Sequence, residues 1–193
     1  MANTDGKFGF RPVNRDGSPY NGATLRCAFA AADATAAFIG DAVVLDGSGT
    51  TDGYPGVSQA AAGEPVFGVV TSFDANPDGL GDQYRKASTL RYCKVAMASG
   101  SFFEVQEDGA DDALLAADVG FNADFVVAAG DTTYGISGME LNAATEATTS
   151  TLDLQIVALV DRADNQLSGT GNANKSVIVK FNDPQDKPLR TGV

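Results

Sequence analysis

The sequence contains no histidine and no tryptophan, and it has only two cysteines among 193 residues. Without histidine, the chain has no imidazole to act as a general base near neutral pH or to bind zinc or copper. A Ser-His-Asp catalytic triad is therefore excluded. The five tyrosines are scattered along the chain, so no platform of aromatic rings for stacking sugars or bases is visible.

Positive charge is also scarce. Against 25 Asp and Glu there are 13 Lys and Arg, which gives a formal net charge of −12. An acidic surface repels phosphate backbones and anionic lipids, so we expect no direct binding to nucleic acid and none to a membrane. No apolar run approaches the roughly 18 residues of a membrane-spanning helix, and the polar N-terminus lacks a secretory signal. These features predict a soluble protein made in the cytoplasm.

The two cysteines, Cys27 and Cys93, are far apart in the sequence and form no C-x-x-C pair. Cytoplasmic thiols are normally kept reduced, so we expect two free thiols. The spacing alone leaves a disulfide between them open.

The 22 glycines recur between short apolar runs, which is typical of many turns that join short strands. Several of these runs alternate apolar and polar residues with the period of two that a strand requires. The predicted strands are residues 42–45, 66–73, 90–98, 102–106, 123–129, 152–161 and 177–182. One short helix is predicted at 112–118, where acidic residues precede an alanine-rich run. The sequence thus predicts a mainly β fold with a barrel, β-tulip-like or sandwich core.

The two ends of the chain differ from its middle. Residues 1–22 are rich in glycine and proline and carry a net charge of 3 − 2 = +1, whereas residues 183–193 are polar and contain two prolines. We expect an extended N-terminal arm (1–22) and a C-terminal tail (183–193) that depend on a partner for order. Between them lies a β-rich body, 23–182, in which the polar stretch 140–151 is either a long loop or a junction between two lobes.

Two motifs suggest chemistry but lack necessary parts. Asp74, Asn76, Asp78 and Gly79 follow the first half of a calcium-binding EF-hand loop, yet its twelfth position, which needs a bidentate glutamate, is Arg85. A turn between strands is the favoured interpretation. Neighbouring acidic residues such as those at 104 and 107, or 111 and 112, are of the type that glycosidases use, but acidic residues at turns are usually solvated. We predict no enzymatic activity, no metal and no cofactor.

Several short segments occur in an order that matches one group of viral proteins. They are FGFRP at 8–12, FIGDAV at 38–43, VFGV at 66–69, YRKAST at 84–89, FEVQED at 103–108 and SGMEL at 137–141. With these segments, the chain resembles capsid decoration (cement) proteins of tailed bacteriophages, and is similar to the lambda-like β-tulip head decoration proteins. The C-terminal Asn182-Asp183-Pro184-Gln185 departs from that pattern, which often has a histidine there.

The resemblance implies a virion structural protein that is assembled in the host cytoplasm and binds the exterior of the capsid. It implies that the major capsid protein is the partner and that the protein is a homo-oligomer, specifically a trimer, which bridges neighbouring shell subunits. The N-terminal arm is flexible and slightly basic, so it is suited to add a strand to an exposed sheet edge of the shell. Phe8, Phe10, Arg11 and Pro12 are the predicted capsid-binding residues. The alternative is a tail- or fibre-associated adhesin that binds a host receptor.

Overall fold

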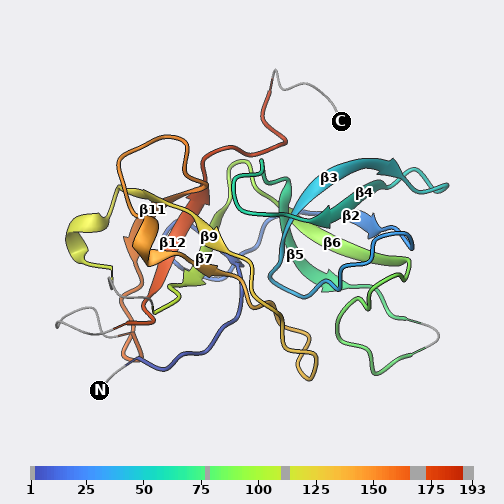
Figure 1. The fold of residues 1–193 in the computed structure, drawn as a ribbon, viewed down its shortest axis with the longest axis horizontal. Coiled ribbons are helices and arrows are strands. Elements are labelled where there is room, and N and C mark those ends of the chain that lie inside the picture. Colours follow the sequence, from blue (N-terminus) through green and yellow to red (C-terminus); the bar gives the residue numbers. More distant parts are fainter. Residues whose placement is uncertain (1–2, 77–78, 110–113, 166–172, 189–193) are drawn as a thin grey trace.

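The computed structural model describes residues 3–76, 79–109, 114–165 and 173–188, and it confirms a mainly β fold. Five strands form a closed barrel in the order β2-β4-β3-β5-β6, which lies on the right in Figure 1. The barrel strands are β2 (Thr24–Phe29), β3 (Ala42–Gly49), β4 (Pro55–Gln59), β5 (Gly68–Phe73) and β6 (Arg91–Met97). A barrel removes exposed sheet edges, which short isolated strands would otherwise present to solvent.

The second unit is a five-stranded antiparallel sheet with the order β1-β7-β12-β11-β8, on the left in Figure 1. Its strands are β1 (Arg11–Val13), β7 (Phe102–Gln106), β8 (Asn122–Ala123), β11 (Leu154–Leu159) and β12 (Ser176–Phe181). A separate pair, β9 (Phe125–Val126) with β10 (Glu140–Leu141), lies beside it, and two single turns of 3-10 helix, η1 (Ala116–Asp118) and η2 (Ala143–Thr145), complete the elements.

The barrel interior is filled by β-branched and aromatic side chains that include Phe29, Val57 and Val95, all fully buried. Irregular register at two places in β3 and β5 bends these strands around the barrel. The barrel closes through β2 and β4, which are parallel and share one residue pair, Ala28 opposite Gly56. A side chain at Gly56 would collide with Ser48 and Asp46, so this closure requires glycine.

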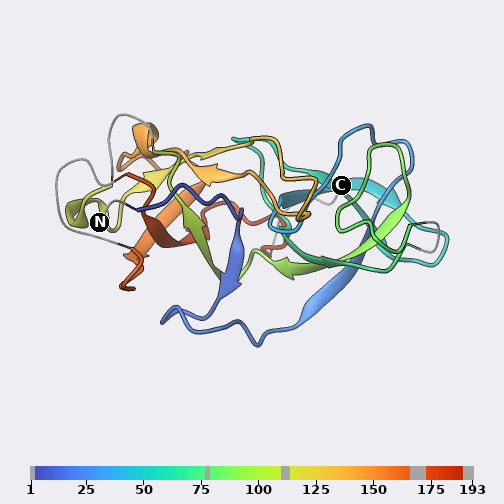
Figure 2. The ribbon, with the colours of Figure 1, turned by 90° about the horizontal axis from the view of Figure 1, so that it is seen from below.

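A larger core lies between the sheet and the barrel. Its centre is a group of phenylalanines in which the ring of Phe10 is 5.1 Å from that of Phe181, 5.8 Å from that of Phe125 and 6.5 Å from that of Phe103. Ala42 and Val69 of the barrel belong to the same cluster. Because one core joins both units, the sheet and the barrel form a single body, elongated in Figure 2.

The structure corrects the expectation of a separate N-terminal arm over residues 1–22. Residues 11–13 are strand β1, which pairs with β7, and the Phe10 N–H donates to the Gly40 carbonyl at 2.9 Å. Gly9 has a φ of +67°, and a side chain there would lie 2.4 Å from Cβ of Ser137. The segment therefore crosses between the barrel and the sheet in a space that only glycine fits.

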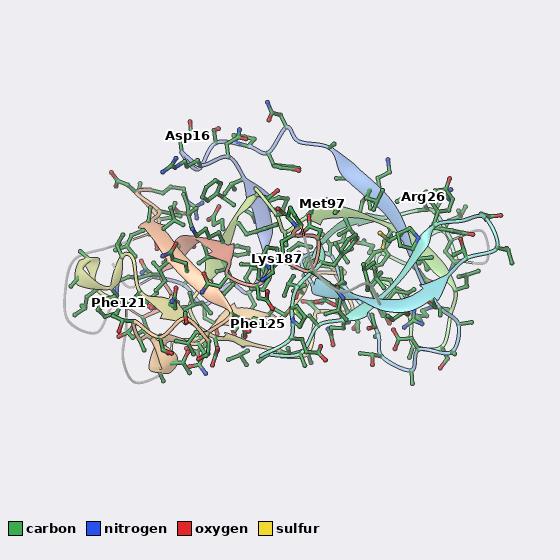
Figure 3. All side chains as sticks on the ribbon, turned by 90° about the horizontal axis from the view of Figure 1, so that it is seen from above. Asp16, Arg26, Met97, Phe121, Phe125 and Lys187 are labelled. Carbon is green, nitrogen blue, oxygen red and sulfur yellow. The ribbon has the colours of Figure 1, made fainter. Side chains whose placement is uncertain are left out.

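The C-terminal tail is likewise tied to the body where it is described, at 183–188. The Gln185 N–H donates to the Val66 carbonyl at 2.7 Å, and the Gln185 side-chain oxygen accepts from the Leu45 N–H at 2.7 Å. The Ser99 N–H donates to Asp186. Figure 3 accordingly places Lys187 near the middle of the molecule. Residues 189–193 lie outside the described part of the chain.

The predicted strand boundaries agree with the structure in most places. Residues 102–106 are strand β7 as predicted, and Leu154 and Ile156 point inward in β11 until the register shifts after Ile156. The predicted strand 123–129 is instead divided between β8 and β9, which pair with different partners. In the predicted helix 112–118, η1 covers 116–118, and residues 112 and 113 lie outside the described ranges.

The change from barrel to sheet lies between β6 and β7, at residues 98–101, and not at 140–151. The stretch 140–151 contains β10 and η2, and its Ala147 exchanges backbone hydrogen bonds with Asn122. It is therefore packed against the sheet and is neither a long free loop nor a junction.

Cys27 and Cys93 are free thiols that face each other in the register of β2 and β6, both fully buried in the barrel. Burial raises the pKa of Cys27 to about 12 and raises that of Cys93 as well. Because the thiolate is the reactive form, we expect no reaction with Ellman's reagent in the native protein and reaction of two thiols per chain in guanidinium chloride. Fast labelling without denaturant would contradict this packing.

Candidate partner-binding groove

A groove of about 710 Å³ lies between the barrel and the sheet. Its walls come from β1, the segment that connects β1 to β2, the middle of β5 and the loops around Ile39 and Ile136. Phe8, Phe10, Arg11 and Pro12, the residues predicted from sequence, all line it. Hereafter we call this the groove. The backbone crossing at Gly9 and Gly40 fixes this part of the chain beside the barrel.

The four predicted residues do not have the same role in the groove. Phe10 is 1% exposed and belongs to the central core, so it cannot serve as an anchor for a partner, which corrects its assignment. Phe8 and Pro12 are half-buried, and the Arg11 side chain is 57% exposed. The Arg11 guanidinium lies over the Phe8 ring at 4.6 Å, a favourable cation-π contact. Phe8, Arg11 and Pro12 are thus the members of this set that a partner can reach.

Arg162 belongs to the same site, although no sequence motif contains it. Its guanidinium forms an ion pair with Glu104, whose other oxygen lies 4.0 Å from Arg11. Burial lowers the pKa of Arg162, but hydrogen bonds and attraction from Glu104 and Asp164 outweigh this, so its pKa is raised. Glu104 is 4% exposed and holds the two arginines at the edge of the groove. Only the pairing of β7 with β1 brings this carboxylate beside Arg11.

Backbone carbonyls of the loop that resembles half of an EF-hand are hydrogen-bonded by Arg91, the first residue of β6. The Arg91 guanidinium donates to the carbonyls of Asp74 at 3.2 Å, Asp82 at 2.7 Å and Tyr84. Backbone carbonyls of this kind are among the ligands of calcium in such loops. Asp78 lies outside the described residues. Over the ranges that the structure does describe, no group of three or more acidic or cysteine side chains is placed to hold a metal ion.

The two carboxylates of β7 and its end are not arranged as a catalytic pair. Glu104 faces the two arginines, whereas Glu107 is fully buried and accepts from the backbone N–H groups of Leu114 and Lys175 at 2.8 and 3.0 Å. Burial raises the pKa of Glu107. The three-residue spacing places these carboxylates on opposite faces of a strand. Residues 111 and 112 lie outside the described ranges.

Asp41, 1% exposed behind the groove, makes stability depend on pH. Burial raises its pKa from 3.8 to about 6, partly offset by hydrogen bonds from Ser137, the Phe38 N–H and Gln59. The folded state therefore binds this proton more tightly than the unfolded state, so its contribution to stability is present below pH 4 and is lost as the pH rises to 6. From the shift, the loss is on the order of 2–3 kcal/mol.

Urea unfolding at pH 4 and pH 7 tests this prediction. Between pH 4 and pH 7, wild type should lose more unfolding free energy than Asp41→Asn does. Asparagine keeps an oxygen acceptor but carries no charge at either pH. An equal difference at both pH values would contradict a raised pKa for Asp41.

Comparison with known proteins gives no assignment: no protein-family model, no curated protein and no solved structure matches the chain. No helix in the described ranges is both long enough and apolar enough to cross a membrane.

Proposed function

We propose that the chain is a virion structural protein, a capsid decoration protein that binds the outside of the shell and bridges neighbouring major capsid subunits. The observation that carries the proposal is the groove, where Phe8, Arg11 and Pro12 are held accessible on a rigid body. Aromatic and arginine side chains are enriched at protein interfaces, and here the half-buried ring of Phe8 lies under the exposed guanidinium of Arg11. The segment order shared with phage decoration proteins supports the same function.

The distribution of reactive groups supports a structural role. The two thiols are sealed in the barrel, and the most deeply buried carboxylates accept hydrogen bonds from backbone N–H groups. Arg85 and Arg91 donate to backbone carbonyls within the fold. These buried polar groups stabilise loops, which suits a protein whose task is to keep its shape under load.

The proposed mechanism is multivalent binding. In a homo-oligomer, for which we propose a trimer, each copy presents one groove to a different shell subunit. Linked contacts of this kind increase the overall affinity by about 10²–10⁴ over a single contact without any new type of interaction. The oligomer therefore stabilises the shell at positions where capsid subunits meet.

The experiment is cryo-electron microscopy of virions of the phage that encodes the chain, together with co-sedimentation of the purified protein with heads that lack it. Density on the head exterior and binding to heads are expected. The double variant Phe8→Ser/Arg11→Gln should bind at least about tenfold more weakly, a loss of about 1.4 kcal/mol. Lys94→Gln, an exposed change on barrel strand β6, is the matched control and should bind as wild type.

Two outcomes would overturn the proposal. Density at the tail tip would instead establish the alternative, an adhesin that binds a host receptor. Absence of the protein from virions would exclude both. Normal binding of the double variant would show that the groove is not the contact, even if the protein decorates heads.

A further inference from the structure

The outer face of the five-stranded sheet carries two neighbouring rows of side chains along β7. In the first row, Glu104 lies opposite Arg11 on one side and Ile178 on the other. In the second row, Phe102 lies opposite Val13. On its other side, Phe102 lies beside Lys180, because the preceding antiparallel pair joins Phe103 and Val179. Residues 102 and 104 are two apart, so both rows face the same side of the sheet.

The second row forms a separate hollow of about 390 Å³, which we call the cationic hollow. Arg15 and Lys180 stand at its walls, and the apolar side chains lining it include Phe102, Val119 and Val157. None of its lining residues is acidic. In the part of the chain that the structure describes, neither Arg15 nor Lys180 has an ion-pair partner.

This lack of partners distinguishes the cationic hollow from most of the surface. Several other exposed cations are neutralised by a nearby carboxylate: Lys7 by Glu140 at 2.7 Å, Arg26 by Asp74 at 2.7 Å and Lys86 by Asp82 at 2.8 Å. Lys94 on β6 is exposed and forms no ion pair in the described ranges, but it lies alone on the barrel. The chain has 25 acidic and 13 basic residues, so a cation placed at random would usually have a carboxylate nearby. Two unpaired cations in one hollow depart from that expectation.

The cations of this face are unequally paired with carboxylates. Arg11 and Arg162 share the carboxylate of Glu104, and Arg162 also pairs with Asp164. Asp16 marks the turn after β1 in Figure 3. The cationic hollow, with Arg15 and Lys180 and no acidic lining residue, is thus the positively charged part of this face.

The spacing of the two rows matches an extended peptide. Residues two apart on a strand are separated by about 7 Å, and this is also the separation of alternate side chains on one face of any extended chain. We propose that this face binds an extended segment of a partner protein with acidic residues at alternate positions. One carboxylate would meet Arg11 and Arg162, and the next would meet Arg15 and Lys180 above the apolar floor.

This inference rests on the proposed function, because it describes the shell segment that the groove and the cationic hollow would bind together. A polypeptide fits better than a nucleic acid for two reasons. The face offers only two cationic positions in line, whereas binding to a phosphate backbone relies on many contacts. The formal net charge of −12 also repels a polyanion that extends beyond the face.

The test uses two fluorescein-labelled, capped peptides with four glutamates each and measures binding by anisotropy at 20 mM salt. In the first, Glu alternates with Thr; in the second, Glu occupies every third position, so that neighbouring carboxylates point to opposite faces of an extended chain. We expect the alternating peptide to bind at least fivefold more tightly. Arg15→Gln/Lys180→Gln should abolish that preference, whereas Lys94→Gln should retain it. Circular dichroism verifies that each variant is folded.

Equal binding of the two peptides, or an unchanged preference in the double variant, would overturn the inference. Tighter binding of a duplex DNA oligonucleotide than of the alternating peptide would overturn it as well. Co-sedimentation with heads distinguishes failure of this inference from failure of the proposed function. If Arg15→Gln/Lys180→Gln loses the peptide preference but binds heads normally, the shell segment is not acidic and only the inference fails. If wild-type protein does not bind heads, the proposed function fails whatever the peptides show.

Discussion

Phe10→Ala is expected to lower the free energy of unfolding by about 3–5 kcal/mol, the usual cost of removing a fully buried phenylalanine side chain. Phe10 is 1% exposed and contacts rings from β7, β9 and β12, so its removal leaves a cavity where the barrel and the sheet share their core. A loss of this size approaches the whole stability of a marginal domain. Chemical denaturation measures it directly.

Phe8→Ala is the matched control, since Phe8 lies two residues away and is half-buried at the rim of the groove. It should lower stability by no more than about 1 kcal/mol while weakening binding to heads. Equal destabilisation by the two changes would contradict the different placement of the two rings. Deletion of residues 1–15 is consequently expected to unfold the protein, because it removes both Phe10 and strand β1.

Arg85→Met should destabilise the protein by about 3–5 kcal/mol, because it removes a buried charge on which several loop carbonyls depend. The guanidinium is fully buried and donates to the carbonyls of Ala30, Asp33, Thr35 and Thr89, with the Asp33 carboxylate at 3.3 Å. Methionine fills similar volume without a donor. The loop between β2 and β3 would then keep only its backbone hydrogen bonds to the loop between β5 and β6, such as those between residues 37 and 85.

Lys86→Met provides the comparison, because Lys86 is exposed and pairs only with Asp82 at the surface. Such a pair contributes less than about 1 kcal/mol. Melting curves of the two variants should therefore differ by many degrees. A small effect of Arg85→Met would show that these loops are held by other contacts.

The sequence was sufficient to predict the β-rich class and most of the longer strands, because period-two alternation persists in segments such as β7 and β12. It did not predict β1, β2 or β4. Strand β1 contains a proline and only three residues, and β4 begins at Pro55 and continues with Gly56, so local preference opposes both. Their pairing depends on neighbours that are distant in sequence, such as Glu104 for Arg11.

The candidate site was predictable only in its local part. The apolar and basic character of residues 8–12 selected a segment that lines the groove, but the same composition suggested a free arm. Nothing in the sequence indicated that the ring of Phe10 would pack against Phe181, or that Arg162 would lie beside Glu104. Composition indicates which residues can bind a partner, whereas long-range pairing decides which of them remain accessible.

The position of β1 has a consequence for biosynthesis. Strand β7 pairs with β1 on one side and with β12 on the other, and Phe10 packs against Phe181 near the end of the chain. Residues 10–13 therefore reach their final environment only after the segment as far as Phe181 has been synthesised. Contacts of such high sequence separation slow folding, so the central core is completed only after β12 has been synthesised, while the barrel strands at 24–97 are able to assemble earlier.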